Sequence, residues 1–292
     1  MKKNRFFSVL AIVTALFMGF TFAACSSDDD ENGDNNNGKI DPSTIATTNL
    51  IAYFPFEDNG VDLIASLSPA AQPNVSYVTG RRGKAYQGAE NAYFLYNLSS
   101  SSKLATMTQG FTVSAWIKPT KVYGDPVPMI FQIGKTSDHF WGNLTWMQER
   151  AGDATAGAAI DSCYYKFCFQ AGGSTQWLAD GFWKKFIPNT WQHLTLSYDG
   201  ATSQFSVYIN GVLYPERSKV LKNATGQNVG NLTFTEADKM VIGGWLTKIL
   251  DNATDAWMGW FKGNLDEFRV YDKGLTATEV KNLYDAEVTQ IN

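Results

Sequence analysis

The sequence contains little of the chemistry on which many enzymes depend. Its 292 residues include only two histidines, His139 and His193, and three cysteines. A serine or cysteine nucleophile paired with histidine would have to be assembled from distant segments, and no motif signals such a site. Basic residues form no patch or stripe, and the formal net charge is −4, so nucleic acid is not expected as a partner.

Hydrophobic and aromatic residues, by contrast, are plentiful. Hydrophobic residues make up 44% of the chain, and aromatic residues 14%, including nine tryptophans. Such a composition is ample for a globular core. The length allows one or two domains, and a single large β-sandwich also fits it.

The first 24 residues have the pattern of a secretory signal peptide. A basic start is followed by an apolar run from Phe6 to Phe22 and then by Ala23 and Ala24. A membrane-spanning helix is the alternative, because the run is near the lower length limit for a span. The sequence FAAC, however, resembles a lipobox, which implies that Cys25 is lipidated and becomes the first residue of a lipoprotein. Contact with the membrane is then expected through the lipid anchor only.

Residues 25–48 are predicted to be a disordered tether. The stretch SSDDDENGDNNNG contains no apolar residue that could be buried, so ordering it would bring no compensating gain. Serine- and aspartate-rich tracts after a lipidated cysteine also resemble surface-export signals of gut-type Gram-negative bacteria. This resemblance implies an outer-membrane protein exposed at the cell surface, with a periplasm-facing protein as the alternative.

From Leu50 onward the sequence predicts short strands. Residues 111–118 (FTVSAWIK) and 191–200 (WQHLTLSYDG) have apolar residues at every second position, which is typical of half-buried strands. Asn210-Gly211 lies between two apolar runs and predicts a type I′ hairpin turn. Thr276 with Glu279 is a capping box that predicts one short C-terminal helix. Many strands with almost no helix predict an all-β sandwich.

Seven motifs resemble, in order, landmarks of the laminin-G-like jelly roll of the concanavalin A-like lectin/glucanase superfamily. The resemblance covers residues 49–287 and implies an all-β sandwich of two antiparallel sheets with one short C-terminal helix, in a domain spanning 49–292. The motifs are LIAYFPFEDN (50–59), GRRGKAYQG (80–88), FTVSAWIKP (111–119), WQHLTLSYDG (191–200), FSVYINGVLY (205–214), VIGGW (241–245) and GNLDEFRVYDKGLTATEV (263–280).

Two long insertions rich in aromatic residues set this chain apart from that family, at 120–190 and 246–261. Long loops on a rigid sandwich are common places for binding sites, and flat aromatic rings stack on the apolar faces of sugars. The alternative is that these rings only pack their own loops onto the sandwich. The candidate ligand-binding residues are Trp141, Trp146, Trp177, Trp183, Trp245, Trp257 and Trp260.

Cys163 and Cys168 flank YYKF within the first insertion. An exported chain can form disulfides, and lipidation of Cys25 leaves this even pair. Residues five apart on one straight strand point to opposite faces, so a bridge between them requires an intervening turn. Two free thiols on one continuous strand are favoured, and a disulfide is the alternative.

The family resemblance also implies a structural Ca²⁺ near the junction of the first and last strands. The positions that carry over are Glu57 and Asp266, with Asp58 and Asp62 as neighbours. Their hard oxygen atoms suit Ca²⁺. The alternatives are a solvated acid at Glu57 and an ion pair between Asp266 and Arg269.

No catalytic residue is predicted. The glucanases of this superfamily place paired carboxylates on an E-x-D-x-E strand, and no such string occurs here. The favoured function is a non-catalytic, cell-surface, carbohydrate-binding lipoprotein whose partner is a glycan. The alternatives are a protein-binding or adhesion module, a structural component of a surface assembly and, last, a glycoside hydrolase.

Overall fold

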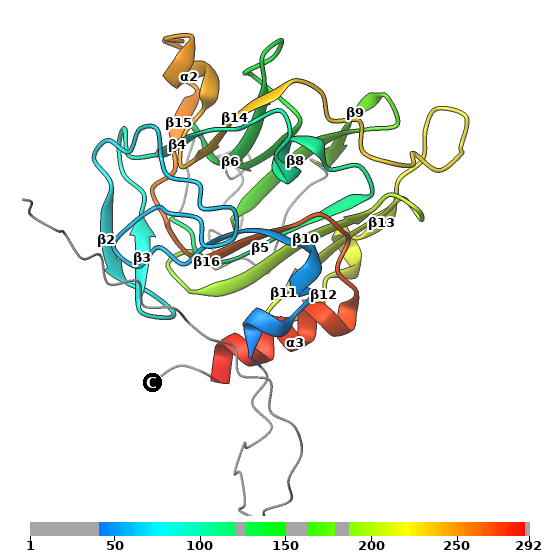
Figure 1. The fold of residues 1–292 in the computed structure, drawn as a ribbon, viewed down its shortest axis with the longest axis horizontal. Coiled ribbons are helices and arrows are strands. Elements are labelled where there is room, and N and C mark those ends of the chain that lie inside the picture. Colours follow the sequence, from blue (N-terminus) through cyan, green and yellow to red (C-terminus); the bar gives the residue numbers. More distant parts are fainter. Residues whose placement is uncertain (1–40, 121–125, 150–162, 179–186, 290–292) are drawn as a thin grey trace, which may run out of the picture. The chain divides into compact units, whose positions relative to one another are not determined.

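Two β-sheets pack face to face in the computed structural model of the protein (Figure 1). The structure describes residues 41–120, 126–149, 163–178 and 187–289, which lie within one compact unit, Gly38–Asn292. Aside from one parallel pair, the strand pairs in these residues are antiparallel, as expected for a jelly-roll sandwich. The predicted fold class is confirmed.

Sheet A contains the first and last strands of the fold. Its order is β12-β11-β10-β5-β16-β3-β2, with β1 paired to β16 and β13 to β11. Its strands are β1 (Leu50–Phe54), β2 (Ser76–Thr79), β3 (Lys84–Gln87), β5 (Gly110–Lys118), β10 (Gln192–Asp199), β11 (Gln204–Ile209), β12 (Val212–Leu213), β13 (Lys219–Val220) and β16 (Asn264–Tyr271).

Sheet B contains the four strands that the described part of the first aromatic insertion forms. Its order is β4-β14-β6-β7-β8-β9, and β15 pairs with β6 in parallel. Its strands are β4 (Phe94–Asn97), β6 (Val127–Lys135), β7 (Leu144–Glu149), β8 (Tyr164–Ala171), β9 (Ser174–Leu178), β14 (Ala237–Ile242) and β15 (Met258–Trp260).

The helices lie outside the two sheets. The predicted C-terminal helix is α3 (Ala277–Thr289), which lies against the outer face of sheet A (Figure 1). Two further short helices, α1 (Lys103–Thr106) and α2 (Leu246–Leu250), were not predicted. The 3₁₀ helices are η1 (Pro42–Thr44), η2 (Thr47–Asn49) and η4 (Pro215–Arg217), and the first two extend the ordered fold before the predicted boundary at residue 49.

Local sequence signals for turns and caps are confirmed. Asn210 and Gly211 have φ angles of 51° and 75° and join β11 to β12 in a two-residue turn, as a type I′ hairpin requires. The Thr276 hydroxyl accepts from the Glu279 N–H at 3.2 Å, and the Glu279 carboxylate accepts from the Thr276 N–H at 2.8 Å. These reciprocal hydrogen bonds satisfy two of the donors that the start of α3 leaves free.

The first and last strands, which lie more than two hundred residues apart in sequence, pair antiparallel. Tyr53 lies opposite Arg269, and Phe54 opposite Phe268. Phe54 and Phe268 point into the core between the sheets, where their ring centroids lie 6.2 Å apart. The Arg269 guanidinium lies on the other face of the sheet, 4.0 Å from the centroid of the Tyr53 ring.

The outer face of sheet A is buried, so the prediction of half-buried strands for β5 and β10 is wrong. Thr112, Ser114 and Trp116 on β5 are buried, as is His193 on β10. The physical reason is the helix α3, whose apolar side chains pack with Tyr271 and Tyr208 over this face. Alternation of polar and apolar residues is present as predicted, but both faces are covered.

A layer of buried charges lies between sheet A and α3. Arg269 on β16 donates to the carboxylates of Glu267, at 2.7 Å, and of Glu287 on α3. Glu287 also accepts from the Trp116 indole N–H at 2.8 Å and lies 3.3 Å from Nε2 of His193. The side chains of Arg269 and Glu287 are 2% and 0% exposed, so this network attaches α3 to the sheet from inside the fold.

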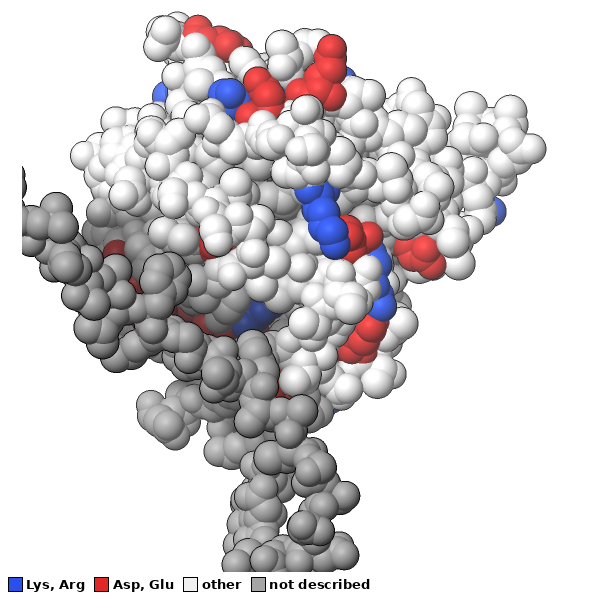
Figure 2. Space-filling model, viewed as in Figure 1, with Lys and Arg blue, Asp and Glu red and all other residues white. Residues whose placement is uncertain are grey.

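Charged residues are few on the face of the molecule shown in Figure 2. In the described part of that face, the basic and acidic side chains are interspersed among uncharged ones. Within the described residues, no helix is both long enough and apolar enough to cross a membrane.

Candidate ligand-binding site

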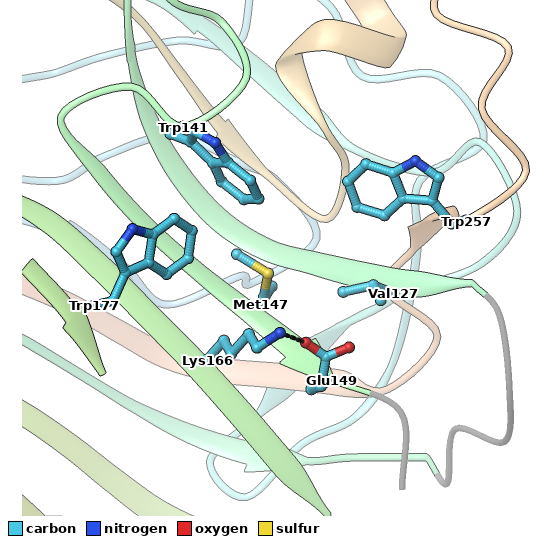
Figure 3. Close-up of a pocket in the computed structure, with 7 residues that line it drawn as sticks. All are labelled: Val127, Trp141, Met147, Glu149, Lys166, Trp177 and Trp257. Atoms are coloured by element: carbon cyan, nitrogen blue, oxygen red, sulfur yellow. Dashed lines mark ion pairs between the residues drawn. The ribbon is translucent and has the colours of Figure 1, made fainter. Parts of the chain in front are cut away.

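A hollow of about 380 Å³ lies on the outer face of sheet B. Three tryptophans stand around it, and two apolar side chains and one ion pair complete it (Figure 3). Within the described part of the chain, seven residues line it: Val127, Trp141, Met147, Glu149, Lys166, Trp177 and Trp257. A volume near 400 Å³ is at the lower end for small-molecule sites, which run from about 300 to 1,000 Å³.

Strand alternation explains why these side chains share one face. On β7, Trp146 points into the core between the sheets, whereas its neighbour Met147 packs in a separate cluster on the outer face. On β8, Phe167 likewise points inward, so Lys166 points outward beside Met147, its partner in the β7–β8 register. The edge strand β9 adds Trp177, which is 41% exposed.

The two other tryptophans of the hollow come from segments outside the sheet. Trp141 lies in the loop between β6 and β7, where Asp138 accepts hydrogen bonds from the N–H groups of Phe140 and Trp141 at 2.9 and 3.0 Å. Trp257 lies just before β15, and its carbonyl accepts from the Val127 N–H at 2.6 Å. Short hydrogen bonds to neighbouring backbone thus hold both segments in place.

Five aromatic rings form a continuous arc around the hollow, which we call the aromatic arc: Trp177, Trp141, Phe140, Trp245 and Trp257. Trp177 contacts Trp141 edge-on, with ring centroids 4.7 Å apart and planes at 84°. Phe140 and Trp245 each contact both Trp141 and Trp257, at centroid distances of 4.4–5.9 Å. Because adjacent rings meet edge-on or tilted, the arc is curved rather than flat.

Buried hydrogen bonds fix the two segments of the arc relative to each other. The side-chain amide of Gln132 on β6 donates to the carbonyls of His139 and Phe140 and accepts from the N–H of Leu246 on α2. On the surface, the His139 ring lies 3.0 Å from the Asp251 carboxylate. The loop that carries Trp141 and the segment that carries Trp257 therefore share two anchors, and the hollow is largely pre-formed.

The polar side of the hollow is a lysine–glutamate ion pair, Lys166 with Glu149 (Figure 3). Their side chains are 36% and 17% exposed, so both are partly withdrawn from water but still reachable. An ammonium has three donors and a carboxylate up to four acceptor sites, so groups that their mutual contact does not use can bind a polar ligand.

The structure brings three of the seven predicted tryptophans, Trp141, Trp177 and Trp257, into one site. Trp183 lies outside the described residues, as do Cys25 and the predicted signal peptide. The remaining three tryptophans do not line the hollow.

Packing accounts for those three tryptophans and corrects their assignment as ligand-binding residues. Trp146 is 1% exposed because strand alternation turns it into the core. Trp245 is 0% exposed, and its indole N–H donates to the Val127 carbonyl at 2.8 Å, so it supports the arc from behind. Trp260 is 7% exposed and stacks on Tyr93, with centroids 5.5 Å apart.

Four lining residues were missed at the sequence level: Val127, Met147, Glu149 and Lys166. The alternation of β7 carries a usable signal, because a Trp146 in the core requires Met147 and Glu149 near it on the opposite face. No comparable signal was available for Val127 or Lys166, which join the site only through strand pairing.

The known proteins that this chain resembles agree with the architecture. A family model described as the concanavalin A-like lectin/glucanases superfamily matches residues 92–281, which is more than half of the chain. The chain belongs to that superfamily. A search of curated proteins finds no match to the sequence.

Several solved structures resemble the fold of the chain at low sequence identity. Domain 4 of AbnA, a GH43 extracellular arabinanase from Geobacillus stearothermophilus in complex with arabinotriose, is 20% identical, with a TM-score of 0.51 over 81% of this chain and 98% of that domain. The ligand-binding domain of botulinum neurotoxin serotype D, in complex with N-acetylneuraminic acid, is 16% identical, with a TM-score of 0.56 over 84% of this chain.

A third similar structure is the receptor-binding domain of a botulinum neurotoxin C/D mosaic serotype, which is 14% identical, with a TM-score of 0.55 over 82% of this chain. The chain spans about half the length of these toxin domains, 51% and 52% of the two described. At such identities the likeness supports the fold.

The acidic residues predicted to hold calcium do not form a cage. Asp62 is buried and accepts from the N–H groups of Tyr53, Ile64 and Ala65 at 2.7–3.0 Å, so it shapes its own loop. Asp58 is exposed, and its nearest cation is Lys84 at 3.9 Å.

The other two acids support the turn between β2 and β3. Glu57 accepts from the Lys84 N–H at 3.0 Å, and one oxygen of Asp266 accepts from the N–H groups of Arg81 and Arg82 at 2.6 and 2.8 Å. Burial raises the pKa of Asp266 to about 8, and its second oxygen is buried with no hydrogen-bond partner.

Ca²⁺ takes six to eight oxygen ligands. Among the described residues, no group of three or more Asp, Glu, His or Cys side chains could hold a metal ion. The four predicted acids therefore do not suffice by themselves, and any calcium at Glu57 and Asp266 would depend on backbone carbonyls and water. Calcium stays a prediction. The alternative ion pair of Asp266 with Arg269 is wrong, because Arg269 binds Glu267 and Glu287 instead.

Cys163 and Cys168 are buried and no disulfide joins them, so the alternative of a bridge between them is wrong. Cys163 directly precedes the continuous strand β8 and points into the core, whereas Cys168 lies on the face that also carries Lys166 and Trp177. No turn separates them, so the sheet itself lies between the two thiols. Burial also raises the pKa of the Cys168 thiol to about 12.

Proposed function

We propose that this protein is a non-catalytic, carbohydrate-binding lipoprotein of the cell surface that binds glycan in the hollow on sheet B. The observation that carries the proposal is the juxtaposition of Trp141, Trp177 and Trp257 with the Lys166–Glu149 pair. The rings offer flat faces to the axial C–H groups of a sugar, and the ion pair offers donors and acceptors to its hydroxyls. Two structures of similar fold are complexes with arabinotriose and with N-acetylneuraminic acid.

The residues around the hollow support binding rather than hydrolysis. Glycoside hydrolases of the common types need two carboxyl groups that flank the scissile bond, about 5–9.5 Å apart. Among the lining residues that the structure describes, only Glu149 has a carboxylate, and it is paired with Lys166. Two further carboxylates, Glu267 and Glu287, are buried against Arg269 under α3 and cannot reach a polysaccharide.

The position of the hollow within the folded unit suits a protein tethered by its N-terminal segment. In the folded unit, η1 and Ile45 pack with α3 on the outer side of sheet A (Figure 1). The described residues that line the hollow lie on the outer side of sheet B. The hollow thus lies on the sheet farther from η1, near which the described part of the chain begins. We propose the outer face of the outer membrane as its location.

A glycan array probed with residues 41–292 tests the binding function. We expect binding that Trp177→Ala and Trp257→Ala each weaken about tenfold or more, as is usual for aromatic hot spots. The matched control is an exposed ion pair outside the hollow, Lys262 with Glu90, where Lys262→Gln should change nothing. A silent array, or binding unchanged in both tryptophan variants, contradicts the proposal.

The anchor needs its own experiment. The full-length protein should incorporate a clickable fatty acid, fractionate with outer membranes and be removed from intact cells by added protease. Cys25→Ser should abolish the label and release the protein from the membrane. Resistance to protease on intact cells would place it on the periplasmic side instead.

A protein-binding or adhesion role is the second candidate. The edge of sheet A exposes Val212, Leu213 and Val220, which are 62%, 42% and 43% exposed. A domain of similar fold, from botulinum neurotoxin DC, is seen in complex with rat synaptotagmin II. If the array is silent, the labelled domain can be tested for binding to cells. Binding that is lost after protease treatment of the cells but kept after glycosidase treatment favours this role, particularly if Val212→Lys abolishes the binding.

A further inference from the structure

We propose that the hollow takes the terminal residue of an uncharged glycan chain and that the Lys166–Glu149 pair binds its hydroxyl groups. The inference rests on the proposed function and adds to it which part of a glycan is bound and which chemical class. It is argued from the curvature of the aromatic arc, the size of the hollow and the balance of its charges.

The curvature of the arc favours a chain end over the middle of a chain. A platform for a long polysaccharide needs rings that lie roughly in one plane, whereas the rings of Trp141 and Trp177, which both line the hollow, meet at 84°. Trp257 stands opposite the Trp141–Trp177 pair, and the ion pair lies across the remaining side, over a floor of Met147 (Figure 3). A ligand enclosed in this way enters end-first.

The size of the hollow agrees with a short ligand. About 380 Å³ is near the minimum for small-molecule sites and leaves room for one or a few sugar rings, not for an extended run. Within that space, a ring can place its apolar face on Trp177 or Trp257 while its edge reaches the ion pair.

The charges of the lining favour a ligand without net charge. Among the described residues that line the hollow, two are charged, Lys166 and Glu149, and they are of opposite sign and form an ion pair. A uronic or sialic acid bound beside Lys166 would also lie beside the Glu149 carboxylate, and a quaternary ammonium in the aromatic arc would lie beside the Lys166 ammonium. A pair of neighbouring hydroxyls can accept from Lys166 and donate to Glu149 at once, which keeps both charges paired in a partly desolvated site.

Calorimetric titration of residues 41–292 tests the chemical class. The probes are arabinotriose, cellotriose and mannotriose as neutral sugars, trigalacturonic acid as an acidic one, and choline as a cation. We expect heat from at least one neutral trisaccharide and none from the acidic sugar or choline. Tighter binding of trigalacturonic acid or choline than of every neutral sugar overturns the inference.

The chain-end claim is tested with one neutral linear polymer cut to several average lengths. At equal mass of sugar, half-saturation should follow the concentration of chain ends, so that shorter fragments bind at proportionally lower mass. Half-saturation that follows the total concentration of sugar units, independent of length, contradicts binding of a terminal residue.

Two conservative variants test the role of the ion pair. Lys166→Gln and Glu149→Gln should each weaken the neutral ligand about tenfold or more, because each removes a charged hydrogen-bonding partner. Glu90→Gln and Lys262→Gln, in the exposed pair, are the matched controls and should bind as the wild type does. Melting curves of all four variants establish that they fold.

The outcomes separate this inference from the function on which it rests. If the wild type binds no glycan, both are wrong. If Trp177→Ala abolishes binding while Lys166→Gln and Glu149→Gln do not change it, the hollow binds glycan but the ion pair does not hydrogen-bond to it. In that case the inference fails and the proposed function stands.

Discussion

Replacing Glu287 by glutamine should lower the free energy of unfolding by about 3 kcal/mol. Glu287 lies on the face of α3 that packs on sheet A and is fully buried, and its carboxylate binds the Arg269 guanidinium and accepts from the Trp116 indole N–H at 2.8 Å. Breaking a buried ion pair by removing one partner costs about 3–5 kcal/mol. The lower end applies here, because Arg269 keeps its second partner, Glu267, and the glutamine carbonyl can still accept one hydrogen bond.

The effect should depend on pH in a defined direction. Burial alone would raise the pKa of Glu287, but the charge of Arg269 and the hydrogen bonds from His193 and Trp116 outweigh it, so the pKa lies below its ordinary value of 4.5. A group whose pKa is lower in the folded state stabilises the fold above its unfolded pKa and loses that contribution as pH falls through the folded value. The difference between wild type and variant should thus be complete near neutral pH and shrink below about pH 4.5.

Urea unfolding followed by tryptophan fluorescence is the assay, with circular dichroism as the second probe. The urea concentration at the midpoint of unfolding should fall. The slope of the free energy of unfolding against urea concentration should not change, because the variant exposes the same surface on unfolding. For a domain of this size, about 3 kcal/mol corresponds to a melting temperature lower by roughly 6–12 °C. The hollow lies on the other sheet, so its structure should not change in the variant.

Asp285→Asn is the matched control on the same helix. Its carboxylate pairs with Lys281 one turn away, and both side chains are about half exposed, at 41% and 53%. Exposed pairs of this kind contribute about 0.3–0.5 kcal/mol. If Glu287→Gln costs no more than Asp285→Asn, or if its cost does not shrink in acid, the buried network does not hold α3 to the sheet as argued.

Three further predictions use other parts of the molecule. Trp146→Ala should cost about 3–5 kcal/mol of stability by leaving a core cavity, whereas Trp177→Ala should cost less than about 1 kcal/mol and be detected by loss of glycan binding; equal melting temperatures would contradict the assignment of faces. Cys163 and Cys168 should stay unlabelled by a thiol reagent until urea unfolds the chain, and two labels per unfolded molecule should follow without reductant. Calcium titrated into chelated protein should release heat and raise the melting temperature, Glu57→Gln should abolish both effects, and the absence of heat and of a melting shift in the wild type excludes the site.

The sequence alone predicted features that depend on near neighbours or on strict periodicity. Asn210-Gly211 specifies its turn because it tolerates positive φ, and Thr276 with Glu279 specifies the start of α3 through mutual hydrogen bonds. The order of seven motifs was enough for the all-β sandwich. Five-residue spacing on a straight strand correctly favoured free thiols at Cys163 and Cys168.

Contacts between segments far apart in the sequence could not be predicted from near neighbours or periodicity. The outer face of β5 was expected in water because its alternation of polar and apolar residues does not reveal that α3 covers it. Arg269 was considered as a partner of Asp266, but the register of β16 and the placement of α3 bring it to Glu267 and Glu287.

The candidate site shows the same division. An abundance of tryptophan in two insertions was visible in the sequence, and it indicated aromatic binding. Only the tertiary structure decided which rings face solvent, because Trp146 and Met147 are neighbours in sequence yet lie on opposite faces of sheet B. Strand pairing then brought Lys166 beside Glu149, and the fold placed Trp257 across from Trp177, a juxtaposition that local sequence cannot encode because the two tryptophans lie 80 residues apart in the sequence.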